Sequence, residues 1–194
     1  MIAGLILAAG ESSRMGTPKA TLTYRGRTFL ERIVQTLQEG GLERIVVVLG
    51  HRAEDIQRQT KIEATQVIIN PAYKSGQTSS LQAGLRSLVS DGADAVLLCL
   101  VDHPAVSAET VKRVVATFRE FSAPVVIPTY HGRRGHPVLI GQQLFEELLG
   151  LTSDAGGDSV VRRYRPATHF VEVEDEGVVI DVDDPESYQR LLRY

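Results

Sequence analysis

The residues best suited to chemistry lie in one short stretch near the N-terminus, residues 7–19. It reads L-A-A-G-E-S-S-R-M-G-T-P-K, with small residues at 8–10 and two basic residues after them. Small side chains let a ligand approach the backbone closely, and a turn with free N–H groups attracts anions. Arg14 adds a planar fork of donors and Lys19 a mobile point charge, which together suit a polyphosphate. The stretch therefore predicts a loop that binds phosphate groups.

The spacing within this loop differs from both established nucleotide-binding patterns. A dinucleotide-binding loop requires G-x-G-x-x-G, and a P-loop requires G-x-x-x-x-G-K-[ST], whereas Thr17 and Pro18 separate Gly16 from Lys19 here. Composition alone leaves one alternative open, which is a surface loop whose charges have no ligand.

Carboxylates occur at two further positions that favour chemistry. Asp102 follows the apolar run A-V-L-L-C-L-V and precedes His103 and Pro104, and an acidic cluster occupies residues 181–184. Mg²⁺ prefers carboxylate, water and phosphate oxygens as ligands. Two structural alternatives remain open, because an Asp before Pro also caps turns and a run of charges is usually a solvated surface segment.

These residues need a regular framework to position them, and the sequence predicts one. Apolar runs predict strands at 2–8, 44–49, 66–69, 95–101, 125–128, 137–140, 170–173 and 178–182. Apolar residues at helical spacing predict helices at 28–39, 53–60, 79–90, after the N-capping Ser107, at 142–149 and at 185–194. Buried strands that alternate with helices indicate an α/β fold with a mostly parallel sheet covered on both faces. Ligands bind such sheets at the carboxyl ends of the strands, where the loop, Gly50-His51 and Asp102 all fall.

Length and composition indicate one compact domain spanning residues 1–194. The net charge of −3 argues against a nucleic-acid-binding protein, which usually carries a basic face. No apolar run reaches the roughly 20 residues of a membrane span, and the N-terminal run lacks the basic leader of a signal peptide. The single cysteine, Cys99, excludes an intramolecular disulfide, and its apolar neighbours indicate an inert buried thiol. Together these features favour a cytoplasmic protein.

The signature L-A-A-G-x-S-x-R-M-G-x-x-K resembles that of the molybdenum-cofactor nucleotidyltransferases, close to their cytidylyltransferase branch. Four further blocks extend the resemblance over nearly the whole chain, and all five occur in the family's order. They are Asn70-Pro71 followed by G-Q-T-S-S-L and Gly84-Leu85, then Asp102-x-Pro104, Gly135-His136-Pro137-Val138, and D-V-D-D-P-E at 181–186.

The resemblance implies a Rossmann-like, three-layer α/β/α fold of the nucleotide-diphospho-sugar transferase type. It also implies a reaction in which an acceptor phosphate attacks the α-phosphorus of a nucleoside triphosphate and pyrophosphate leaves. In that reaction Arg14 and Lys19 are the expected catalytic residues, and Asp102 and Asp183 hold Mg²⁺, with Asp181 as the rival second ligand. The resemblance implies nucleotide binding by Leu7, Ala8, Ala9, Gly10, Glu11, Ser12, Ser13, Arg14, Met15, Gly16, Lys19, Gln77, Ser79 and Ser80.

The roles of three side chains keep a structural alternative. Ser79 and Ser80 either bind the base or cap the helix that follows them. His136 is expected near the second substrate, although a lone His in a Gly-rich loop more often has a structural role.

The expected donor and acceptor follow from smaller differences between the branches of the family. The guanylyl branch usually has Gly where this chain has Ala9, and the extra methyl group narrows the space under the base, which favours CTP. The acceptor implied is molybdopterin or its Mo form, with a molybdoenzyme or its chaperone as a further partner.

The sequence departs from the family pattern in two places, at the metal-binding block Asp102-x-Pro104 and at the motif expected near the acceptor. The family usually has Gln at the position of His103, and its Gly-Asp-x-Gly-x-Arg motif matches residues 154–162 only loosely.

Several alternatives remain beside this hypothesis. The same chemistry fits GTP as the donor or a sugar phosphate as the acceptor. A non-catalytic protein that binds and delivers the pterin cofactor is a second class, which the carboxylates argue against because a carrier needs no metal. A dinucleotide-dependent oxidoreductase is disfavoured by the missing G-x-G-x-x-G.

Overall fold

The computed structural model describes residues 1–62, 65–152 and 155–194. Its main feature is an eight-stranded sheet with the order β10-β7-β9-β6-β1-β4-β5 and with β8 paired to β7. The strands are β1 (Ile2–Ala8), β4 (Ile45–Leu49), β5 (Gln66–Ile69), β6 (Ala95–Leu100), β7 (Val125–Tyr130), β8 (Arg133–Arg134), β9 (Val138–Gly141) and β10 (Thr168–Glu172). Only β8 and β9 run antiparallel to their neighbours. The prediction of a mostly parallel sheet is therefore confirmed.

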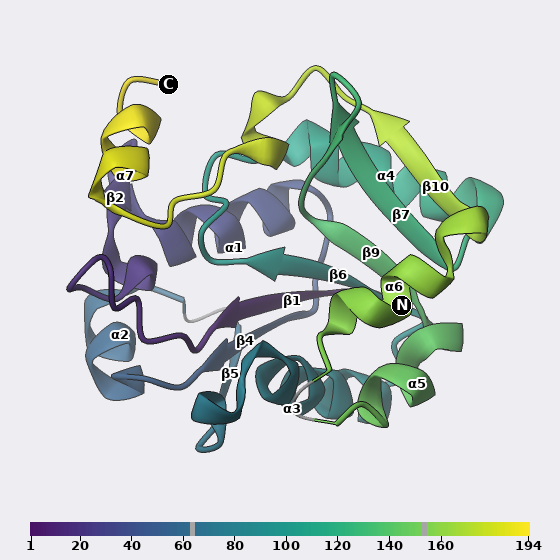
Figure 1. Ribbon diagram of the computed structural model, residues 1–194, viewed down its shortest axis with the longest axis horizontal. Helices are drawn as coiled ribbons and strands as arrows, with labels where there is room; N and C mark the ends of the chain where they lie inside the picture. Colours follow the sequence, from purple (N-terminus) through teal and green to yellow (C-terminus); the bar gives the residue numbers. More distant parts are fainter. Residues whose placement is uncertain (63–64, 153–154) are drawn as a thin grey trace.

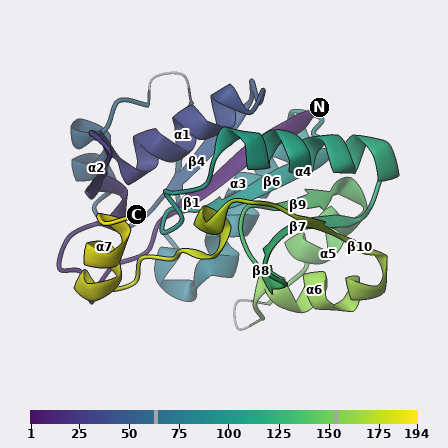
Figure 2. The same ribbon diagram turned by 90° about the horizontal axis from the view of Figure 1, so that it is seen from above.

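Helices cover both faces of this sheet, which gives the three predicted layers (Figures 1 and 2). They are α1 (Phe29–Glu39), α2 (Ala53–Gln59), α3 (Gln77–Ser90), α4 (Ala108–Phe121), α5 (Phe145–Leu149), α6 (Gly157–Arg163) and α7 (Pro185–Leu191). The core on one face contains side chains of α1, α2 and α4, and the core on the other contains side chains of α3, α5 and α6. A small hairpin, β2 (Thr23–Tyr24) and β3 (Arg27–Thr28), lies beside α7 at the rim.

The central strands form because their side chains are apolar on both faces. Leu5 and Ile6 of β1 are fully buried, one in each of the two large core clusters. Helix α3 packs closely on this strand through Gly84, where a Cβ atom would lie 2.3 Å from Leu5 Cδ1 and 2.9 Å from Val48 Cγ2. A larger residue at Gly84 would push the helix off the sheet, so this glycine permits the close packing of α3 on β1 and β4.

Helices α4 and α1 both start at side-chain caps, and the sequence predicted the first of these, Ser107. Ser107 accepts a hydrogen bond from the Thr110 amide at the start of α4. Thr28 and Glu31 form a reciprocal capping box at the start of α1. Each such cap contributes about 1 kcal/mol because it satisfies amides that have no partner within the helix.

The predicted strand at 178–182 is wrong. This segment begins with a 3-10 turn, η5 (Glu176–Val179), and continues without a strand partner. Its apolar residues are buried for another reason: Val178 packs in the core beside α4, and Val182 packs against α7. Helix α6 was absent from the prediction, since it is short and begins at Gly157.

Two expectations about the environment can be compared with the fold. Cys99 is buried, and burial raises the pKa of its thiol to about 12, which makes the thiolate scarce at neutral pH. Across residues 1–62, 65–152 and 155–194, no helix has the length and apolar character that crossing a bilayer requires.

Candidate active site

A cleft of about 380 Å³ opens at the carboxyl ends of the central strands. The predicted site residues that line it are Leu7, Ala8, Ala9, Gly10, Ser12, Ser13, Arg14, Lys19, Gln77, Ser80, Asp102 and Asp183. Predicted site residues outside the lining are Glu11, Met15, Gly16, Ser79 and His136. The cleft thus brings together residues from the first, second, third and last blocks of the sequence.

The loop after β1 is closed by Ser12, whose backbone lies in the left-handed region at φ 51°. Its hydroxyl accepts a hydrogen bond from the Lys19 amide at 3.1 Å, and its carbonyl accepts one from the Met15 amide at 2.9 Å. Glu11 and Gly16 are exposed on the outer side of this loop. The two contacts of Ser12 fix where Lys19 leaves the loop.

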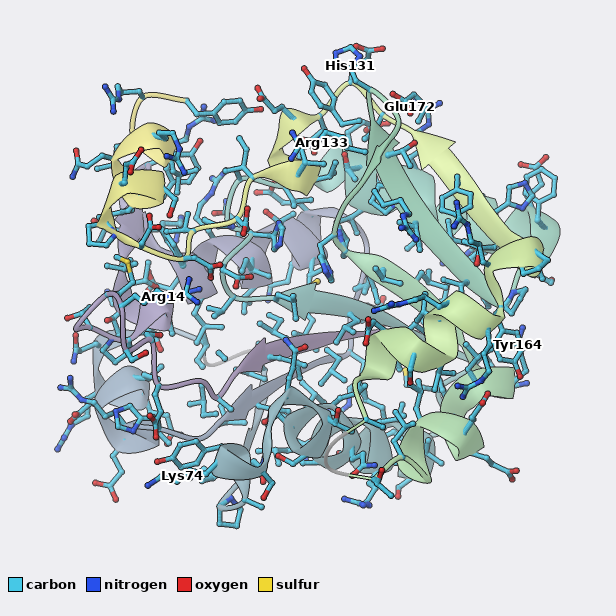
Figure 3. All side chains as sticks on the ribbon, viewed as in Figure 1. Arg14, Lys74, His131, Arg133, Tyr164 and Glu172 are labelled. Atoms are coloured by element: carbon cyan, nitrogen blue, oxygen red, sulfur yellow. The ribbon has the colours of Figure 1, made fainter. Side chains whose placement is uncertain are left out.

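Lys19 joins the charged groups of the cleft. Its ammonium lies 2.6 Å from Asp183 Oδ1 and 3.3 Å from Asp102 Oδ2, with only 13% of its side chain exposed. Arg14, which is exposed, reaches to 3.9 Å from Asp183 Oδ2 (Figure 3). The hydrogen bond from Lys19 lowers the pKa of Asp183, so this carboxylate is ionised at neutral pH.

A backbone hydrogen bond brings the carboxylates of Asp102 and Asp183 to the same end of the cleft. The Val182 amide donates to the Asp102 carbonyl at 3.0 Å, which aligns Asp183 with the end of β6. Asp184 caps α7 by accepting from the Ser187 amide. Asp181 is exposed and lies outside the cleft lining. Within the acidic run, therefore, Asp183 faces the cleft while Asp184 has the structural role of a cap.

The two aspartates suit a hard divalent cation. Asp102 Oδ1 is buried and has no hydrogen-bond partner, with His103 Nε2 at 3.8 Å from it, so one carboxylate oxygen is left for another ligand. No group of three or more His, Cys, Asp or Glu residues in the described part of the chain is arranged to hold a metal alone. An ion held here would need oxygens from water or substrate, which is typical of Mg²⁺ at phosphate sites.

The opposite end of the cleft has no charged side chain in its lining. Tyr73, Gly76, Gln77 and Ser80 line it. Ser80 is 3% exposed and its hydroxyl accepts from Asn70 Nδ2 at 3.0 Å. The Ser79 hydroxyl accepts from the same Asn70 Nδ2 at 2.9 Å and donates to the Gly76 carbonyl at 2.8 Å. Helix α3 begins after Gly76 without a side-chain cap, so neither serine caps this helix. This end offers aromatic, amide and hydroxyl groups, which stack on and hydrogen-bond to a heterocyclic base.

His136 lies beside His103 rather than in the cleft, with 4.9 Å between the ring centroids. The Nδ1 atoms of both rings are buried without a hydrogen-bond partner. His136 borders a second cavity of about 370 Å³, which shares Leu7, Gln77 and Leu100 with the first. Burial, with a smaller contribution from His103, lowers the pKa of His136 to about 4. His136 is therefore neutral at pH 7.

This burial predicts a loss of stability in acid. An unfolded histidine takes up a proton near pH 6.5, whereas His136 resists protonation to about pH 4, so the unfolded state binds more protons in between. We expect the free energy of unfolding to fall by up to about 3 kcal/mol from this residue between pH 7 and pH 4. Urea unfolding at pH 7, 5.5 and 4 measures the loss, which a His136→Gln variant should reduce.

The control for this experiment is His131→Gln, since His131 is exposed on the β7–β8 hairpin (Figure 3). An identical pH dependence in the His136→Gln protein and the wild type would contradict the assignment.

Sequence reasoning missed several residues that line the cleft: Pro18, Ala20, Tyr73, Leu100 and Val101. Most are apolar neighbours of predicted positions. Tyr73 had a signal of its own, because it follows the Asn70-Pro71 turn at the end of a strand. In the loosely matched stretch at 154–162, Asp154 lies outside the described residues, and Asp158 borders the second cavity.

Residues 4–168 match the MobA-like NTP transferase domain. The chain belongs to this family. A matching curated relative of this MobA-like protein is nicotine blue oxidoreductase of Paenarthrobacter nicotinovorans, 32% identical and covering 98% of this chain and 96% of the relative. Molybdenum cofactor cytidylyltransferase of Escherichia coli is 24% identical over 95% of this chain and 92% of its own.

Solved structures agree with this membership. The crystal structure of Rv0371c from Mycobacterium tuberculosis has a TM-score of 0.89 and 30% identity, covering 100% of this chain and 97% of that one. A manganese complex of the same protein has a TM-score of 0.79 and 26% identity, covering 99% and 98%. The MobA-like chain therefore has the Rossmann-like fold that its signature predicted.

Proposed function

We propose that this MobA-like nucleotidyltransferase transfers CMP from CTP to a phosphorylated acceptor, molybdopterin or its Mo form, and releases pyrophosphate. The observation that carries the proposal is the contact of Lys19 with Asp102 and Asp183 at one end of a cleft whose other end suits a base. A cation and two carboxylates at that spacing are what a triphosphate and its metal require. The reaction takes place in the cytoplasm and its product passes to a molybdoenzyme or its chaperone.

The chemistry needs positioning and charge neutralisation. An oxygen of the acceptor phosphate forms a bond to the α-phosphorus of CTP, and the bond from that phosphorus to the bridging oxygen breaks, so pyrophosphate leaves with the electron pair. The nucleophile is already an anion, and no protein base is required. Arg14 and Lys19 bind the triphosphate and neutralise the charge that develops on it.

Asp102 and Asp183 would hold Mg²⁺ in the proposed reaction. When bound, Mg²⁺ neutralises phosphate charge and polarises the bonds to phosphorus. The free Asp102 Oδ1 supports this role, and so does the manganese complex of the related M. tuberculosis protein. Asp183 is favoured over Asp181 as the second ligand because Asp183 lines the cleft.

The choice of CTP rests on Ala9. This residue is 5% exposed and lines the cleft, so its methyl group takes up space beside the base. A pyrimidine is the smaller base and tolerates the narrower space.

The acceptor is proposed to enter through the second cavity, which His136 borders and which shares Leu7, Gln77 and Leu100 with the cleft. Its lining is mostly apolar and includes Leu81, Leu98, Val138 and Ile140, which suits a flat ring system. His136 contributes a neutral imidazole that can hydrogen-bond to the acceptor without adding charge.

The test supplies each of the four nucleoside triphosphates with molybdopterin and Mg²⁺ and measures pyrophosphate. We expect release to be fastest with CTP and to require the acceptor and the metal together. Fastest release with GTP would overturn the base assignment. No release with any triphosphate would favour a carrier of the cofactor, and the same preparation should then be assayed for the oxidoreductase activity for which its P. nicotinovorans relative is named.

A further inference from the structure

The strand order separates the two ends of the cleft. Asp102 follows β6, Tyr73 follows β5, and the two strands β1 and β4 lie between them. Neighbouring strands are about 4.8 Å apart, so three steps separate the carboxylate and the tyrosine by roughly 14 Å. In the proposed function the triphosphate binds at the β6 side. The nucleoside must then extend toward the β5 side, where Tyr73 lines the cleft.

The position of Tyr73 is fixed by the turn that carries it. It begins the short turn η2 (Tyr73–Ser75), after Asn70, whose side chain accepts from the Ala72 amide at 3.0 Å. Asn70 is 5% exposed, so this turn is anchored in the interior. Gly76 ends the turn with φ at 103°, a backbone conformation that favours glycine. The Tyr73 ring is half-buried and presents part of its surface to the cleft.

The segment Gly50-His51 connects Tyr73 to Ala9 at the end of β1. A Cβ atom on Gly50 would lie 2.6 Å from Tyr73 Cβ and 2.8 Å from the Ala9 carbonyl oxygen. The His51 amide donates to that same carbonyl at 3.1 Å, and His51 Nδ1 lies 3.4 Å from the Tyr73 hydroxyl. Gly50 and His51 therefore contact both Ala9 and Tyr73, and they set the distance between the Ala9 peptide and the tyrosine.

We propose that the ring of Tyr73 is the surface on which the nucleotide base stacks, with Ala9 lining the cleft beside the base. This assignment rests on the proposed function, because it needs a nucleoside triphosphate in the cleft. An aromatic ring stacks on any base, since every base has a π face. Tyr73 therefore supplies affinity for the base, while Ala9 supplies the choice between bases.

The first experiment compares CTP with inorganic tripolyphosphate, which has the phosphates and lacks the base. Loss of stacking on one base weakens binding by about 5-fold to 150-fold. We expect Tyr73→Leu to weaken CTP binding within that range in isothermal titration, and Tyr73→Phe to restore most of it. Binding of tripolyphosphate should stay unchanged in both variants, which also shows that they are folded.

The second experiment uses the absence of tryptophan from the chain. A Tyr73→Trp variant places one fluorophore in the cleft, and a stacked base should quench its emission when CTP binds. Tripolyphosphate should leave the emission unchanged. The matched control is Tyr164→Trp, since Tyr164 lies on the far side of the molecule from Lys74, the neighbour of Tyr73 (Figure 3). CTP should not quench that variant.

The outcomes separate this assignment from the proposed function. If neither CTP nor tripolyphosphate binds the wild-type protein, the proposed function fails. If both bind and Tyr73→Leu weakens neither, the function stands and the stacking role of Tyr73 is wrong. Unchanged emission from the Tyr73→Trp variant on saturation with CTP would overturn it independently.

Discussion

Replacing Asp102 with Ala is expected to reduce pyrophosphate release by about a hundredfold to a thousandfold or more. The proposed metal would lose a ligand whose free oxygen is buried, and the Lys19 ammonium would lose one of its two carboxylates. Steady-state pyrophosphate release at saturating CTP, acceptor and Mg²⁺ measures the effect. Asp102 is partly exposed in the cleft at the end of β6, so the melting temperature should change little.

Two further variants make this result interpretable. Asp91→Ala removes an exposed carboxylate after α3 that pairs with Arg44, away from the cleft, and should leave release unchanged. Asp181→Ala separates the two possible second ligands, because only Asp183 lines the cleft. Normal turnover in the Asp102→Ala protein would remove this residue from the metal site. A larger loss from Asp181→Ala than from Asp183→Ala would reverse the choice between them.

Replacing Lys19 with Ala is expected to lower kcat/KM for CTP and to raise the affinity for Mn²⁺. The triphosphate loses a largely buried cation, so kcat/KM for CTP should fall by about a hundredfold or more. The metal loses a competitor for the oxygens of Asp102 and Asp183. Titration with Mn²⁺ in the absence of nucleotide should therefore show tighter binding to Lys19→Ala than to the wild type.

The control for this variant is Lys74→Ala, an exposed lysine outside the cleft lining. It should change neither constant, because solvent screens its charge. If Lys19→Ala weakened CTP and Mn²⁺ alike, the ammonium would be supporting the site as a whole and would not compete with the metal.

The regular part of the fold followed from local rules. The apolar character of β1 and β6 and the Ser107 cap appear directly in the sequence, and each led to an element that the structure contains. The strand predicted at residues 178–182 was wrong because an apolar segment can be buried without a strand partner. Helix α6 was missed for another reason, since only two adjacent residues of its sequence, Val160 and Val161, are apolar and they show no helical period.

In the candidate site, too, residues defined by local sequence were predictable and residues that depend on tertiary contacts were not. The loop residues were predictable because they are adjacent in sequence and share a signature. The contact of Lys19 with Asp183 depends on a backbone hydrogen bond from Val182 to Asp102, which no local pattern encodes. Tyr73 was missed because its role depends on Gly50 and on the order of β4 and β5 in the sheet.

The contact between Lys19 and Asp183 also has a consequence for the order of events during synthesis of the chain. Lys19 and Asp183 are 164 positions apart, so a ribosome delivers the lysine long before its carboxylate partner. The ion pair between Lys19 and Asp183 can therefore form only after nearly the whole chain has been synthesised, and the charged end of the cleft is completed last.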